Sequence, residues 1–138
     1  MKAAWLLSVV LFSLSACADS YLGPEGASLN REFSLRVGTK VVIASEDLTI
    51  SFGTVLQDSR CPLGVVCVWP GNGTVLLQLS KPGFAQASAE LNTTLDPRET
   101  TYVQYAIVLK VLDPYPQEGV TIDPASYIAK ILVYKVVR

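Results

Sequence analysis

Three cysteines, Cys17, Cys61 and Cys67, are the most reactive side chains of this sequence, because a cysteine can carry a lipid, ligate a metal or pair with another thiol. The sequence contains no histidine. That absence rules out Ser-His-Asp and Cys-His catalytic arrangements and the usual histidine-based zinc sites. Only carboxylates or a lysine are left for acid–base catalysis, and no spacing singles one out. We therefore expect no catalytic residue, no metal site, no cofactor and no enzyme.

The densest cluster of unusual residues begins at Asp58, includes Arg60 and ends at Trp69. In one continuous strand the Cα atoms of Cys61 and Cys67 would lie about 20 Å apart, at ~3.3 Å per residue. A disulfide needs a separation of about 4.4–6.8 Å, so the chain must turn back between the two cysteines. In an oxidising compartment we expect them to form a disulfide that shapes one loop. A thiol redox role is the weaker alternative, because the spacing is not Cys-x-x-Cys.

The residues around this pair allow two interpretations. In the structural one, Asp58 accepts backbone N–H groups in a turn, Arg60 pairs with a carboxylate, and Trp69 packs over the disulfide. In the functional one, the loop presents Arg60 and Trp69 as binding residues, since Arg and Trp dominate the hot spots of interfaces. Both interpretations place Asp58, Arg60 and Trp69 at the loop that the two cysteines close.

The start of the sequence has the features of an export signal. Lys2 precedes an apolar and small-residue stretch, Ala3 to Ala16, that is shorter than the ~20 residues needed to cross a bilayer. Residues 14–17, Leu-Ser-Ala-Cys, resemble the lipobox of bacterial lipoproteins. This resemblance implies cleavage before Cys17 and lipidation of its amino terminus, which holds the protein to a membrane.

The predicted organisation is a signal peptide at 1–16, a lipidated N-terminus and flexible tether at 17–31, and one domain at 32–138. Ala18 rather than Asp follows the cysteine, so the lipoprotein resemblance implies the outer membrane in preference to the inner one. The alternative is cleavage after Ala18 by an ordinary signal peptidase, which would release a soluble secreted protein beginning at Asp19.

Charge narrows the range of partners. The formal net charge is −1 and no basic run is present, so we expect no nucleic-acid partner. We expect the protein to be a monomer. Its expected partners are the membrane, which it contacts through its lipid, and a protein of the cell envelope.

A second resemblance lies in the cysteine cluster. Residues 58–62 read Asp-Ser-Arg-Cys-Pro, and residues 67–71 follow the pattern Cys-x-Trp-x-Gly. Together they resemble a motif of uncharacterised bacterial lipoproteins and exported proteins, in which alanine is common where this sequence has Pro70. The resemblance implies an envelope protein and implies no particular activity.

Alternating apolar residues and regularly spaced turn signals predict strands throughout the domain. Leu48, Ile50, Phe52 and Leu56 are expected on one face of a long strand, with a bulge at Gly53. The predicted strands cover residues 32–36, 41–43, 48–57, 65–69, 74–79, 86–91, 103–111 and 127–137, the last as a central strand.

Two turns are predicted between these strands. Asn72-Gly73 is the strongest short hairpin signal and should join 65–69 to 74–79. Lys81-Pro82-Gly83 offers Pro and Gly at the central positions of a type II turn.

The expected fold is therefore all-β, an antiparallel sandwich of seven or eight strands, immunoglobulin-like in size, with a small barrel as the alternative. The expected function is that of a binding or structural module on a membrane anchor. A carboxylate-dependent hydrolase and an inhibitor of exported proteases are the alternatives, the second by analogy of fold alone.

Overall fold

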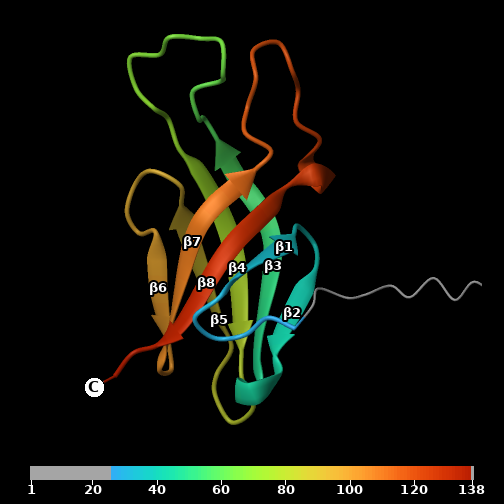
Figure 1. Cartoon of the computed structure of the whole chain (residues 1–138), viewed down its shortest axis with the longest axis vertical. Helices are drawn as coiled ribbons and strands as arrows, with labels where there is room; N and C mark the ends of the chain where they lie inside the picture. Colours follow the sequence, from blue (N-terminus) through green and yellow to red (C-terminus); the bar gives the residue numbers. More distant parts are fainter. Residues whose placement is uncertain (1–25, 138) are drawn as a thin grey trace, which may run out of the picture.

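The computed structural model describes residues 26–137. Eight strands form two four-stranded antiparallel sheets that pack face to face (Figure 1). The predicted all-β sandwich is confirmed, and the two sheets are separate, unlike the closed barrel that was the alternative. The predicted signal peptide, Cys17 and the first part of the tether lie outside the described residues.

The strands follow one another with two short 3₁₀ turns between them. Their bounds are β1 Glu32–Arg36, β2 Lys40–Ile43, η1 Ala44–Glu46, β3 Leu48–Asp58, β4 Gly73–Ser80, β5 Ala87–Asn92, β6 Glu99–Tyr102, β7 Tyr105–Asp113, η2 Pro124–Ser126 and β8 Ile128–Lys135.

Each sheet is built around consecutive antiparallel strands. One sheet has the order β2-β3-β4-β5 and the other has the order β1-β8-β7-β6. The chain crosses between the sheets twice, from β1 to β2 and from β5 to β6. Strand β8 lies inside its sheet, between β1 and β7, as its apolar sequence predicted.

The core fills the space between the facing sheets, because alternate side chains of each strand point inward. Burying each Leu, Ile or Phe side chain contributes roughly 1.5–3 kcal/mol. The side chains with no exposed surface include Ile43, Leu48, Ile50, Phe52, Val75, Leu77, Leu91, Ile107, Ile131 and Val133.

The bulge predicted at Gly53 is confirmed, since the register of β3 against β4 shifts between Phe52 and Thr54. The bulge also corrects one prediction. The extra residue exchanges inward and outward positions until a second register shift between Val55 and Gln57. As a result Leu56 is 49% exposed and Val55 packs against the core in its place.

The predicted strand at 65–69 is wrong, and so is the predicted hairpin at Asn72-Gly73. Residues 59–72 form one long connection from β3 to β4, and Gly73 is already the first residue of β4. A disulfide joins Cys61 to Cys67 within this segment, and its strand-like pairing with another segment is limited to an isolated bridge between Leu63 and Gln117. We call residues 59–72 the stapled loop.

The predicted strand at 103–111 is also corrected. Val103 has a positive φ of 57° and lies with Gln104 in a two-residue turn between β6 and β7. The strand before this turn, β6, was not predicted, because Glu-Thr-Thr-Tyr has no apolar alternation. The turn at Lys81-Pro82-Gly83 is confirmed by the bond from the Phe84 N–H to the Lys81 carbonyl and by a Gly83 φ of 83°.

Three connections gather at one end of the sandwich (Figure 1). They are the stapled loop, the β5–β6 loop (residues 93–98) and the β7–β8 loop (residues 114–127). The N–H of Leu63 donates to the Pro116 carbonyl, and the N–H of Glu118 donates to the Leu63 carbonyl. These bonds join the stapled loop to the β7–β8 loop.

Candidate functional site

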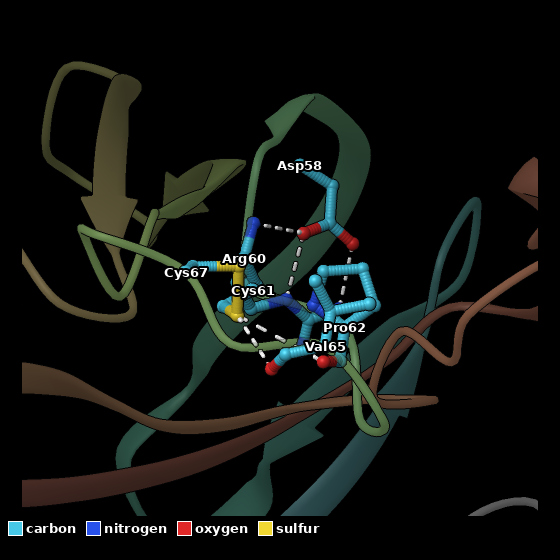
Figure 2. Close-up of a disulfide and its surroundings, with 6 residues drawn as sticks. All are labelled: Asp58, Arg60, Cys61, Pro62, Val65 and Cys67. Atoms are coloured by element: carbon cyan, nitrogen blue, oxygen red, sulfur yellow. Dashed lines mark hydrogen bonds and ion pairs between the residues drawn. A yellow bond between two sulfur atoms is a disulfide. The ribbon is translucent and has the colours of Figure 1, made fainter.

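The stapled loop is closed at its base by Cys61 and Cys67 (Figure 2). Their sulfur atoms are 2.11 Å apart and their Cα atoms 6.0 Å apart. The Cys61 N–H also donates to the Pro70 carbonyl, and the Ser59 N–H donates to the Asn72 carbonyl. The disulfide and the two backbone bonds hold the two arms of the loop together.

Asp58, the last residue of β3, and Arg60, in the first part of the stapled loop, form a buried ion pair. Arg60 Nη2 is 2.6 Å from Asp58 Oδ2, and Arg60 Nε donates to Asp58 Oδ1 at 2.7 Å. The two side chains are only 4% and 10% exposed. The backbone N–H of Arg60 donates to the same Oδ1 at 3.3 Å, so the turn predicted around Asp58 is present.

The same guanidinium binds the end of β7 and the start of the β7–β8 loop. Its Nη1 donates to the carbonyl of Leu112, and its Nη2 donates to the carbonyl of Pro114 at 2.9 Å. Its central carbon lies 5.1 Å from the centre of the Tyr115 ring, within the range of a cation–π contact. Each nitrogen of the Arg60 guanidinium thus has a partner inside the protein, which agrees with the structural interpretation of this residue.

Tyr127 completes the ion pair, since its hydroxyl donates to Asp58 Oδ2 at 2.9 Å. Burial disfavours the charged form of Asp58, but hydrogen bonds from Arg60 and Tyr127 outweigh burial and lower the Asp58 pKa below 3.8. Burial, together with the hydrogen bond to Asp58, raises the pKa of Tyr127 to about 12. Asp58 is therefore an ionised acceptor at neutral pH, and Tyr127 is a protonated donor.

Asn72 joins the stapled loop to the β5–β6 loop. Its Nδ2 donates to Asn92 Oδ1 at 2.8 Å, and its Oδ1 accepts the N–H groups of Thr94 and Leu95. Asn72 is 7% exposed and its amide has partners at both ends. Asn72 is therefore a buried residue that connects two loops, and it does not form the predicted hairpin turn.

The outer part of the stapled loop is apolar and exposed. Residues 61–71 include no charged side chain. Val66 is 100% exposed, Val68 88% and Trp69 79%. Among Asp58, Arg60 and Trp69, only Trp69 therefore offers its side chain to a partner. We call Leu63, Val66, Val68 and Trp69 the apolar tip.

A groove of about 530 Å³ runs between the stapled loop and the β5–β6 loop. Trp69 and Leu95 are its large apolar side chains, and Leu95 is 60% exposed. Gln57, Thr94 and Asp96 add exposed polar groups. This second wall could not be predicted from the sequence, because nothing in residues 92–96 marks them as neighbours of Trp69.

The described carboxylates with shifted pKa values do not resemble a general acid. Tyr105 and Lys135, by hydrogen bonding to Glu46, lower its pKa, and the pKa of Asp58 is lowered as well. A hydrolase acid needs a raised pKa. Within residues 26–137, no three metal-ligating side chains come together. None of the helices that the structure describes is long and apolar enough to cross a membrane.

Comparisons with protein-family models, with curated proteins and with solved structures found no match for this sequence.

Proposed function

We propose that this protein is a lipid-anchored lipoprotein of the cell envelope, and that its β-sandwich is a binding module for an envelope protein. The lipid on Cys17 holds the chain to a membrane, with the outer membrane as the expected location. The apolar tip makes the contact with the partner. The observation that carries the proposal is the near-complete exposure of Val66, Val68 and Trp69 on a loop held in shape by a disulfide.

The composition of the tip suits a protein interface. The centre of such an interface is depleted of charged residues and enriched in aromatic ones, and a few anchors carry most of the binding energy. The tip has one Trp beside three aliphatic side chains and no charge. Exposing these side chains to water has a cost that binding would remove.

The rigidity of the loop also favours binding. The disulfide, the Arg60 contacts and the bonds from Leu63 to the β7–β8 loop order the loop before any partner arrives. A preordered loop loses little conformational entropy on association, so more of the contact energy appears as affinity.

The chain enters the domain away from the tip. The N–H of Asn30 donates to the carbonyl of Val133, which pairs with Ile107 near the start of β7. The stapled loop lies beyond the opposite end of these strands, where Asp113 pairs with Ile128 (Figure 1). A tether attached on the Asn30 side would allow the tip to point away from the anchoring membrane.

The test is co-purification from solubilised envelopes with the double variant Val66→Ser/Val68→Ser. We expect this variant to fold normally and to lose at least one protein that the wild type retains. Val42→Ser is the matched control, because Val42 is an exposed valine on β2, distant from the tip. Equal recovery of every protein by the three forms would contradict the proposal.

A further inference from the structure

We propose that the groove between the stapled loop and the β5–β6 loop binds an uncharged sugar ring, the hexopyranose unit of a glycan strand. This site is distinct from the contact proposed for the apolar tip. Val66 and Val68 do not line the groove, and Gln57, Leu95 and Asp96 do not belong to the tip. Trp69 borders both surfaces.

The shape of the groove suits a small polar ligand. Its volume of about 530 Å³ lies within the ~300–1,000 Å³ typical of small-molecule sites. It is open along one side, so a unit within a longer strand can enter without threading. The other side chains of the apolar tip, Leu63, Val66 and Val68, do not line the groove.

Two large apolar side chains offer a platform for a ring. Trp69 is 79% exposed and Leu95 is 60% exposed, one on each wall. A pyranose ring has a face of C–H groups that stacks on an indole, because the electron-rich aromatic face attracts the weakly positive C–H hydrogens. An exposed Trp in a concave site is the arrangement such stacking needs.

The rim supplies hydrogen bonds for hydroxyl groups. Gln57 offers both donor and acceptor capacity, Thr94 offers a hydroxyl, and Asp96 offers two carboxylate oxygens. All three side chains belong to exposed residues. Hydroxyls around the edge of a sugar ring can bond to these groups while the C–H face stays on the Trp.

Charge selects among ligands that share this shape. Asp96 is the only charged residue that lines the groove, and no Lys or Arg does. A phosphate, a sulfate or a uronic acid would therefore meet repulsion without a compensating cation. This favours uncharged glycans over lipid headgroups and other anionic ligands.

The two walls of the groove are held in a fixed relative position before any ligand binds. Asn72 bonds to Asn92 and to the N–H groups of Thr94 and Leu95, so it fixes one wall against the other. The groove is thus built into the fold and does not depend on a ligand to close it.

The test uses the full-length lipidated protein in a detergent without a sugar headgroup. Chitotetraose and cellotetraose are the uncharged probes, and a hyaluronan tetrasaccharide is the anionic one. The sequence holds two Trp residues, and cleavage before Cys17 would remove Trp5 and leave Trp69 as the fluorescent reporter. We expect a saturable change in fluorescence with at least one uncharged probe and weaker binding of the anionic one.

Calorimetry on variants locates the site. Trp69→Ala and Leu95→Ser should each weaken binding of the uncharged probe by about tenfold or more, whereas Val66→Ser should leave it unchanged. Asp96→Asn should reduce the difference in affinity between the uncharged probes and the anionic one. The inference is overturned if neither uncharged probe binds, if binding survives Trp69→Ala, or if Val66→Ser abolishes it. The last result would place the sugar on the apolar tip. Because sugar binding and partner binding are measured separately, a failure of the co-purification experiment would not change the outcome of this one.

Discussion

Arg60 and Asp58, two positions apart at the end of β3, form an ion pair inside the protein, with Nη2 and Oδ2 2.6 Å apart. The same guanidinium also donates to the carbonyl of Leu112 near the end of β7 and to that of Pro114 at the start of the β7–β8 loop. One side chain therefore joins the end of β3, the stapled loop and the start of the β7–β8 loop. The exposed tip depends on this buried support for its shape.

Arg60→Met should be strongly destabilising. Removing one partner of a buried pair leaves the other charge uncompensated, which costs about 3–5 kcal/mol. Urea denaturation followed by circular dichroism measures this loss of unfolding free energy. The control is Lys130→Met, because Lys130 is 45% exposed and 3.9 Å from Asp113, and a surface pair contributes only about 0–1 kcal/mol. Similar losses in the two variants would refute the structural role of Arg60.

Tyr127→Phe should lower stability by ~1.5–3 kcal/mol at neutral pH, since it removes a hydrogen bond to a charged group. The Asp58 pKa is lowered by folding, so its contribution is present above pH 3.8 and is lost as pH falls through its folded value. The Tyr127 pKa is raised, so its contribution is present below pH 10.0 and is lost as pH rises through about 12.

The difference in unfolding free energy between wild type and Tyr127→Phe should therefore form a plateau around neutral pH and shrink at both extremes. Denaturation at a series of pH values measures it. Tyr134→Phe is the control, because the Tyr134 hydroxyl makes a long, exposed 3.4 Å bond to Glu99. A difference that does not vary with pH would contradict the assigned coupling.

Gly71→Ala should disrupt the stapled loop. Gly71 has a φ of 71°, and a Cβ there would lie 1.8 Å from the Ser59 carbonyl oxygen, which is backbone and cannot move aside. Gly83 has a similar φ of 83° but nothing within 4 Å of its Cβ position, so Gly83→Ala pays only the backbone strain of about 1 kcal/mol. Thermal melts should show a much larger decrease in Tm for Gly71→Ala. Equal decreases would mean that the close contact is absent in solution.

Most of the sandwich could be predicted from local pattern. Apolar alternation located β1, β2, β3, β4, β5 and β8 within a residue or two, because inward side chains must repeat with period two. The strand predictions were wrong where contacts between distant parts of the sequence determine the local structure. Residues 65–69 have a strand-like composition, but the disulfide and the Arg60 network hold them in a loop. The short strand β6 exists because it pairs with β7, which its own sequence does not reveal.

The candidate site was only partly foreseeable. Cysteine spacing indicated a closed loop around Cys61 and Cys67, and the fold brings the two sulfur atoms together. Whether Arg60 or Trp69 faces water could not be read from the sequence, because the burial of Arg60 depends on carbonyls more than 50 positions away along the chain. The groove depends on Asn72 reaching Asn92, a contact between separate loops.

Lipidation predicts a defined mature mass. A chain cleaved before Cys17 and acylated there should have the mass of residues 17–138 plus a diacylglyceryl and an acyl group, and it should partition into detergent. One acyl chain alone would bind a membrane only marginally. Cys17→Ser should abolish both the added mass and the partitioning. A wild-type polypeptide that begins at Asp19 without added mass would contradict the anchor and favour the secreted alternative.

Photo-crosslinking in intact envelopes tests most directly whether the apolar tip contacts an envelope protein. A photoreactive residue placed at position 66 should give an adduct with one protein of defined mass, and the same residue at position 42 should not. Ultraviolet-dependent adducts, resolved by electrophoresis and identified by mass spectrometry, are the readout. No adduct at position 66, or the same adducts at both positions, would contradict the account.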